Sequence, residues 1–174
     1  MENKQVKLGI IGAMDVEVAT LMDHTQDAVL SERAGMRFCE GTLAGMPVVI
    51  AKCGVGKVSA GMCVQAMCDL YGVTHIVNTG VAGSLDAQID IADLVVSTDA
   101  LYYDVDVTPW GYEPGQLPGM DCLAFPADPT LRVAIEHAAA LAAPDVRVFA
   151  GRVVSGDQFI ASSQAKERLA QEFG

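Results

Sequence analysis

The chain has 174 residues, which is about the length of one domain. Hydrophobic residues make up 51% and charged residues 19%, so the chain can fill a packed core and does not have the composition of a disordered protein. The formal net charge of −11 has the wrong sign for a surface that neutralises phosphates, which argues against nucleic-acid binding. No apolar run approaches the ~18 residues of a membrane span and no export signal is recognisable. We therefore expect a cytoplasmic protein with no membrane contact.

Strands and helices alternate along the chain. The ranges predicted as strands are Val6–Met14, Met36–Leu43, Pro47–Lys52, His75–Asn78, Leu94–Ser97 and Val146–Ser155. The ranges predicted as helices are Asp15–Met22, Val58–Leu70 ended by Gly72, Pro129–Ala142, and Ser162–Phe173 with Ser162 as N-cap. The proline- and glycine-rich segment Tyr102–Leu123 is predicted to be a long loop of the kind that carries function. This order predicts one α/β domain over residues 1–174 with a largely parallel sheet.

The cysteines indicate neither a disulfide framework nor a zinc site. They are odd in number, form no CxxC pair, and have no histidine at zinc-finger spacing. We expect all five to be buried thiols and expect no bound metal: Cys39, Cys53, Cys63, Cys68 and Cys122.

Three glycine-bearing turns each follow a predicted strand, at residues 12–14, 54–56 and 80–83. The strict phosphate-binding patterns fail, because Ala51 and Val58 stand where a Walker motif needs glycine and Ser or Thr. The first turn also lacks the third glycine of a dinucleotide fingerprint. In an open α/β sheet the carboxyl ends of the strands line the ligand crevice, so we expect these turns to border a binding site.

A carboxylate and several aromatic residues stand close to these segments. Glu17 lies one helical turn beyond the first strand, where it either faces the crevice or simply complements the helix dipole. Asp157 is open to two interpretations, a turn former or a site residue. The loop aromatics either stack on a flat ligand or cover the edge of a core: Trp110, Tyr112 and Phe159.

Six stretches in order closely resemble the bacterial 5'-methylthioadenosine/S-adenosylhomocysteine nucleosidases of the nucleoside phosphorylase superfamily. The resemblance implies a three-layer α/β domain with a central mixed, largely parallel sheet, a homodimer, and no metal or organic cofactor. The stretches are Gly9-Ile10-Ile11-Gly12-Ala13-Met14 with Glu17-Val18; Gly54-Val55-Gly56-Lys57-Val58; Asn78-Thr79-Gly80-Val81-Ala82-Gly83; Asp104-Val105-Asp106-Val107-Thr108; Gly111-Tyr112-Glu113 with Gly115-Gln116-Leu117-Pro118-Gly119; and Val154-Ser155-Gly156-Asp157 with Phe159-Ile160.

The resemblance also implies a reaction and a site. The reaction is hydrolysis of the N-glycosidic bond of the two nucleosides, releasing adenine and a thioribose, with Glu17 activating the water. Val81 replaces a serine that many relatives carry at this position. The remaining roles are these: Ala13 and Met14 flank the ribose and water; Val55 adjoins the ribose and alkylthio group; Val107 and Trp110 line the base and alkylthio pockets; Phe159 stacks on adenine; the backbone of Ile160 bonds the edge of the base; and Pro118 reaches the partner's alkylthio pocket.

In the family, the closing helix leads into a strand whose glutamate binds the ribose hydroxyls, and a later aspartate protonates the leaving base. The 174 residues contain neither segment, so we expect an incomplete domain that lacks its last strand and helix and has little activity alone. Two alternatives stay open: an inactive nucleoside- or adenine-binding fragment, or a related purine nucleosidase or phosphorylase, including one acting on futalosine.

Overall fold

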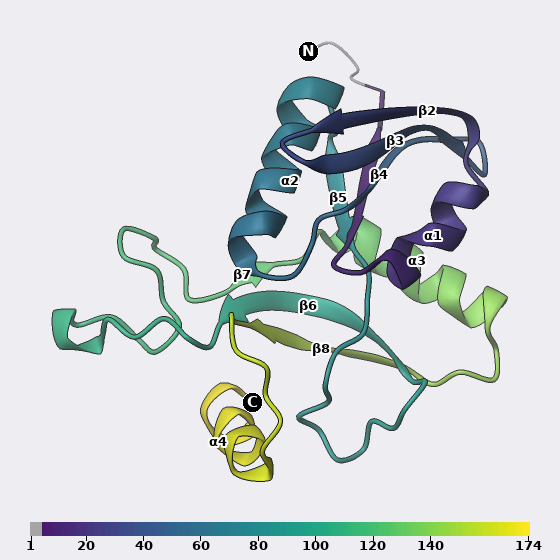
Figure 1. Ribbon diagram of the computed structural model, residues 1–174. Coiled ribbons are helices and arrows are strands. Elements are labelled where there is room, and N and C mark those ends of the chain that lie inside the picture. Colours follow the sequence, from purple (N-terminus) through teal and green to yellow (C-terminus); the bar gives the residue numbers. More distant parts are fainter. Residues whose placement is uncertain (1–4) are drawn as a thin grey trace. The chain divides into compact units, whose positions relative to one another are not determined.

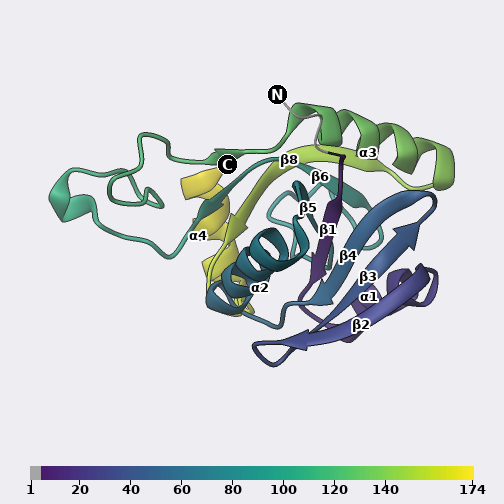
Figure 2. The same ribbon diagram turned by 90° about the horizontal axis from the view of Figure 1, so that it is seen from above.

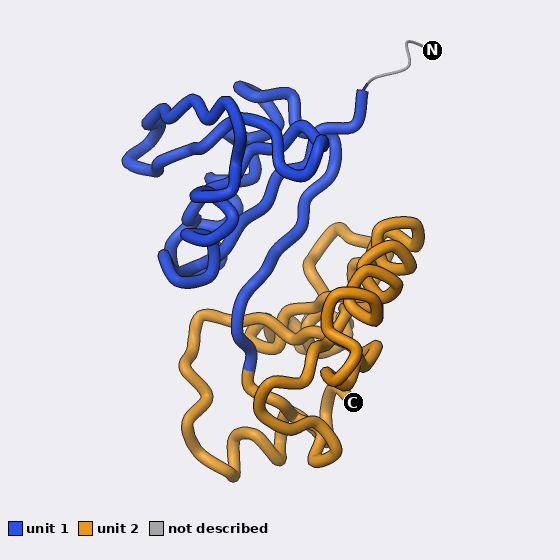
Figure 3. The backbone as a smooth tube through the Cα atoms, turned by 90° about the vertical axis from the view of Figure 1, so that its right-hand side faces the viewer, with its two compact units in different colours: residues 1–82 blue, residues 83–174 orange. Residues whose placement is uncertain are grey.

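The computed structural model describes residues 5–174 and divides the chain into two compact units, one ending at Ala82 and the other beginning at Gly83 (Figure 3). Each unit has its own hydrogen-bonded sheet. We expected one central sheet, and the hydrogen bonding of the described residues instead forms two. The organisation of residues 1–174 as one domain stays a prediction.

The first unit is built on a five-stranded mixed sheet in the order β2-β3-β4-β1-β5 (Figure 1). Strand β1 lies between β4 and β5 and is parallel to both, whereas β2, β3 and β4 form an antiparallel meander. The strands are β1 (Leu8–Gly12), β2 (Gln26–Arg33), β3 (Met36–Leu43), β4 (Met46–Lys52) and β5 (His75–Asn78).

Helices α1 (Asp15–Asp23) and α2 (Lys57–Tyr71) pack on opposite faces of this sheet (Figure 2). Because side chains alternate along a strand, Val48 and Ile50 of β4 join the cluster beneath α1, while Val49 and Ala51 join the one beneath α2. All four are fully or almost fully buried, which explains why this run is apolar without alternation. The unit is therefore three layers deep, helix on sheet on helix.

The second unit has a three-stranded sheet in the order β7-β6-β8. Strands β6 and β8 are parallel, and the short β7 is antiparallel to β6. Leu101 of β6 packs with Leu169 and Phe173 of α4 in the core of this unit, and α3 contacts β6 and β8. The elements are β6 (Leu94–Tyr102), β7 (Phe125–Pro126), α3 (Pro129–Ala142), β8 (Val148–Ser155) and α4 (Ser163–Phe173).

Two helix boundaries expected from sequence are confirmed by their hydrogen bonds and backbone angles. The hydroxyl of Ser162 accepts from the Ala165 N–H at 3.1 Å and caps α4. Gly72 ends α2 in the left-handed conformation with φ of 65°, which glycine adopts without steric cost. Strands β2 and β7 were not predicted, because β2 is an exposed edge strand with little apolar pattern and β7 has only two residues.

The cysteines differ partly from expectation. Cys39, Cys53 and Cys63 are buried as predicted, but Cys68 is exposed on α2 and Cys122 is half-buried. The prediction was wrong for Cys68 because it occupies the outer face of an amphipathic helix.

Within residues 5–174, no helix combines the length and apolar character needed to cross a membrane.

The thiols should react in the order of their burial. Burial raises the pKa of Cys63 to about 11, so this thiol stays protonated at pH 8. We expect iodoacetamide at pH 8 to alkylate Cys68 first and to reach Cys63 only after denaturation, as followed by peptide mass spectrometry. Alkylation of Cys63 in the native protein at the rate of Cys68 would contradict the packing of α2.

Candidate active site

The three glycine-bearing turns lie next to one another because they follow three adjacent parallel strands. The order β4-β1-β5 places Gly12 opposite Lys52 and Ile11 opposite Asn78. Beyond the strand ends, the Cys53 N–H donates to the carbonyl of Gly12 at 2.9 Å, and the Thr79 N–H donates to that of Ile11 at 2.9 Å. The expected arrangement at one edge of the sheet is thus observed within the first unit.

Glu17 is the charged side chain that joins two of these turns. Its Oε2 accepts a hydrogen bond from the Met14 N–H at 2.9 Å, and its Oε1 accepts one from the Val81 N–H at 3.0 Å. The first bond caps helix α1, and the second reaches a turn 64 residues further along the chain. One carboxylate oxygen therefore caps the helix, and the other holds the turn after β5; that Glu17 also faces a binding crevice stays a prediction.

The carboxylate can accept further hydrogen bonds. Each carboxylate oxygen has two acceptor positions, and each oxygen of Glu17 uses one for a backbone N–H. The residue is half-buried and so is not sealed from solvent. This geometry suits a carboxylate that holds and orients a water molecule.

Two glycines make room for Glu17. A Cβ on Gly80 would lie 2.5 Å from Oε1 and 2.8 Å from Cδ of Glu17, and a Cβ on Gly12 would lie 2.9 Å from its Cβ. Real Cβ atoms essentially never approach other heavy atoms so closely. Glu17 can therefore occupy its observed position because positions 12 and 80 carry no side chain.

Cys53 is a neighbour of this site that sequence reasoning did not select. Its thiol donates to the carbonyl of Gly12 at 3.3 Å, and burial, together with the nearby charge of Glu17, raises the pKa of Cys53. Its protonated thiol is a poor nucleophile, so it serves as a packing residue beneath the first turn. The sequence does place Cys53 directly after β4, and this position at a strand end could have indicated that it lies near the site.

The other site residues expected in the first unit lie in the same three turns after β1, β4 and β5. Ala13 and Met14 form the turn between β1 and α1, and Val55 and Val81 lie in the turns after β4 and β5. Val55 and Val81 are 80% and 81% exposed. Exposed apolar side chains at the ends of adjacent strands are suited to contact an apolar group of a ligand.

The expected residues of the second unit lie on two segments. Val107, Trp110 and Pro118 belong to the loop after β6, in which residues 108–110 form a short 3-10 helix. The Asp106 carboxylate accepts hydrogen bonds from the hydroxyl and N–H of Thr108, and these bonds lower the pKa of Asp106. Trp110 is 75% exposed.

Phe159 and Ile160 lie between β8 and α4. The Phe159 ring is 96% exposed, whereas Ile160 packs against the core of this unit. The predicted residues therefore divide between the two units, and those of the second unit lie on two segments, the loop after β6 and the stretch between β8 and α4.

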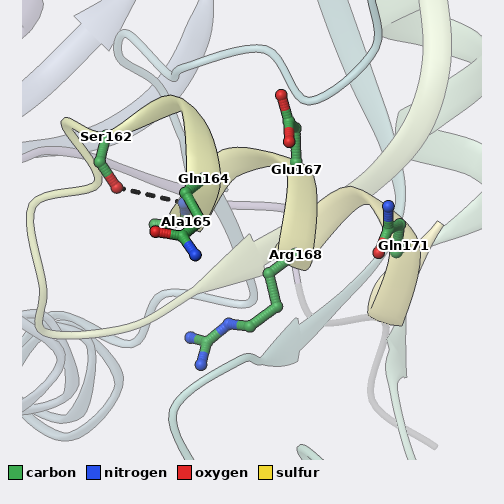
Figure 4. A pocket seen from close by; sticks show the side chains of 6 residues that line it. All are labelled: Ser162, Gln164, Ala165, Glu167, Arg168 and Gln171. Carbon is green, nitrogen blue, oxygen red and sulfur yellow. Dashed lines mark hydrogen bonds between the residues drawn. The ribbon is translucent and has the colours of Figure 1, made fainter.

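A surface hollow lies elsewhere, along helix α4 (Figure 4). All of its lining residues belong to α4 or its cap, and none is a predicted site residue. The side chains of Glu167 and Arg168 extend away from the helix in different directions (Figure 4). One face of a single helix gives no enclosed, convergent set of polar groups, so this hollow is not a candidate site.

Residues 5–174 contain no cluster of His, Cys, Asp and Glu that could hold a metal ion.

Comparison of the sequence with known proteins identifies the family of this chain. Residues 7–174 match the model of the Phosphorylase superfamily. The 5'-methylthioadenosine/S-adenosylhomocysteine nucleosidase of Colwellia psychrerythraea is 40% identical over 171 residues, which cover 97% of this chain and 70% of that protein. The chain therefore belongs to the 5'-methylthioadenosine/S-adenosylhomocysteine nucleosidase family of the phosphorylase superfamily.

Solved structures agree with this assignment. The Colwellia psychrerythraea nucleosidase in complex with adenine superposes with a TM-score of 0.90 and 38% identity, covering 96% of this chain and 69% of that one. The Neisseria meningitidis nucleosidase in complex with methylthio-immucillin-A gives a TM-score of 0.92 and 32% identity, covering 96% and 71%. The predicted α/β class, of the nucleoside phosphorylase type with mixed strand pairing, is confirmed.

The glycine at position 80 provides a direct test of the Glu17 geometry. We expect Gly80→Ala to lower the free energy of unfolding by about 1–3 kcal/mol, because its methyl group overlaps the carboxylate. Gly83→Ala is the matched control, because nothing lies within 4 Å of a Cβ there. Thermal unfolding of both variants measures the difference.

A double-mutant cycle shows whether the overlap is with Glu17. In a Glu17→Ala background the obstructing atoms are gone, and the cost of Gly80→Ala should shrink. An equal cost in both backgrounds would mean that Gly80 acts through another neighbour.

Proposed function

We propose that this protein hydrolyses the N-glycosidic bond of 5'-methylthioadenosine and S-adenosylhomocysteine, releasing adenine and a thioribose. The observation that carries the proposal is the carboxylate of Glu17, held by two backbone N–H groups where the turns after β1 and β5 meet. The relatives named for this activity support it, as does the adenine complex of the Colwellia psychrerythraea enzyme.

The chemistry requires a base beside the sugar. Glycosidic bonds break through an oxocarbenium-like transition state, and a water must attack the anomeric carbon as the base departs. In this proposal Glu17 orients that water with its unused acceptor positions and takes its proton. The N–H groups of Met14 and Val81 keep the carboxylate from rotating away.

The remaining site residues bind the parts of the nucleoside. Ala13 and Met14 flank the ribose and the water, and Val55 and Val81 present exposed apolar surface towards the ribose and alkylthio group. Val81 supplies a backbone N–H to Glu17 but no side-chain hydroxyl.

In the second unit, Phe159 stacks on adenine and the backbone of Ile160 bonds the edge of the base. Val107 and Trp110 line the base and alkylthio pockets. The exposure of the Phe159 and Trp110 rings supports these roles, because a ring that stacks on a ligand must be free before the ligand binds.

The proposal includes a homodimer in the cytoplasm. Pro118 would contact the alkylthio pocket of the partner subunit, and its exposed position in the loop after β6 is compatible with that role. Free thiols at all five cysteines are typical of a reducing compartment.

The role of Glu17 can be tested against a neighbouring carboxylate. We expect Glu17→Gln to lower adenine release from 5'-methylthioadenosine by about 10²–10⁴-fold, because the amide cannot accept the proton of the water. Asp15→Asn is the control, since Asp15 occupies the same first turn but pairs with Lys52 at 2.7 Å. Adenine release is measured spectrophotometrically with the full-length protein, and full turnover by Glu17→Gln would refute the assignment.

The sugar product separates hydrolysis from phosphorolysis. With 5'-methylthioadenosine and inorganic phosphate, the proposal predicts free methylthioribose at the same rate with and without phosphate, as identified by mass spectrometry. A phosphate-dependent methylthioribose 1-phosphate would indicate a phosphorylase, and adenine binding without turnover would indicate a binding protein.

A further inference from the structure

Tyr103 lies where two segments of the second unit meet. It directly follows β6, and its backbone N–H donates to the carbonyl of Ser155 at the end of β8, at 3.0 Å. Its side chain reaches from the start of the long loop to Gln158, in the turn that carries Phe159. Sequence reasoning assigned no role to this tyrosine.

The hydroxyl of Tyr103 is bonded twice to one residue of that turn. It donates to the carbonyl of Gln158 at 2.7 Å and accepts from the Gln158 N–H at 3.3 Å. A single hydroxyl can do both, because it has one donor and two acceptor positions. Both backbone polar groups of Gln158 are thereby occupied by one side chain.

The ring of Tyr103 lies against Gly156. A Cβ on Gly156 would come within 2.7 Å of Cε1 and 2.8 Å of Cε2 of the tyrosine. A larger residue at position 156 would therefore require the ring to move, and we expect such a movement to weaken both hydroxyl bonds. The neighbouring Asp104 adds a further support, because its Oδ2 accepts from the Asp157 N–H at 2.9 Å.

These contacts fix the backbone on both sides of Phe159. Gln158 is held by the Tyr103 hydroxyl, and Ile160 packs in the cluster of Leu101, Leu169 and Phe173. The Phe159 ring between them is 96% exposed. A rigid backbone that presents a free aromatic ring is a preorganised stacking surface, since little freedom is lost when a flat ligand binds.

We propose that Tyr103 is a positioning residue for base binding: its hydroxyl holds the turn at Gln158 so that Phe159 and the backbone of Ile160 meet the purine in a fixed geometry. The inference rests on the proposed function, which places the base at Phe159 and Ile160. Tyr103 itself touches the turn and acts through it.

Tyr103→Phe removes only the hydroxyl and keeps the ring against Gly156. Without these two hydrogen bonds the turn must be ordered when the base binds, so we expect adenine binding to weaken roughly tenfold. The base is held in both the ground state and the transition state, so KM should rise by a similar factor while kcat changes little. Gly156→Ala should reproduce this pattern, because it displaces the same ring.

Tyr71→Phe is the matched control. It also removes a hydroxyl from a half-buried tyrosine, one that bonds to the Ser31 hydroxyl at 2.6 Å in the first unit. Adenine affinity is measured by calorimetry and the kinetic constants with 5'-methylthioadenosine, for the full-length protein and each variant. A loss of affinity in Tyr103→Phe that Tyr71→Phe does not share supports the proposal.

Amide hydrogen exchange tests the same geometry without substrate. The Gln158 N–H should exchange faster in Tyr103→Phe than in the unaltered protein, and at an unchanged rate in Tyr71→Phe. Unchanged exchange at Gln158, or unchanged adenine affinity in an active Tyr103→Phe enzyme, would overturn the role of Tyr103. If the unaltered protein neither binds adenine nor releases it, the proposed function fails, and the base-positioning role fails with it.

Discussion

The carboxylate of Glu17 connects two parts of the first unit that are far apart in sequence. One oxygen caps α1 through the Met14 N–H, and the other holds the turn after β5 through the Val81 N–H. A Cβ at Gly80 would overlap this carboxylate, so the observed position of Glu17 depends on the glycine there. Folding therefore places the proposed base before any ligand arrives, which is the preorganisation that general base catalysis requires.

This arrangement depends on parallel strands. Because β4, β1 and β5 run in the same direction, their carboxyl ends lie at one edge, and the turns that follow them become neighbours. Burial of β4 on both faces, against α1 and α2, holds it in the centre of the sheet beside β1. In the second unit, β6 and β8 are parallel in the same way, and Tyr103 and Gly156 follow their ends. In both units, segments that carry predicted site residues therefore begin at the carboxyl ends of parallel strands.

Sequence reasoning identified the helices, the principal strands and the three turns, because continuous apolar runs, glycines and the Ser162 cap are local signals. It missed β2, because its residues are mostly exposed and it is held as a strand by pairing with β3, which a local sequence pattern does not reveal. Spacing alone left Glu17 open between a helix-capping acid and a site residue, since spacing cannot show that Oε1 reaches the Val81 N–H. Only the family resemblance implied that Glu17 activates the water. The role of Tyr103 could not be predicted either, because its hydrogen-bond partner Gln158 lies 55 residues away in the sequence.

Amide hydrogen exchange at Met14 and Val81, compared between the unaltered protein and Glu17→Ala, tests the bridging role of Glu17 most directly. Both amides donate to the carboxylate, so both should exchange faster when it is removed. Faster exchange at Met14 alone would contradict the account, because Glu17 would then be only the cap of α1 and not the link between the two turns.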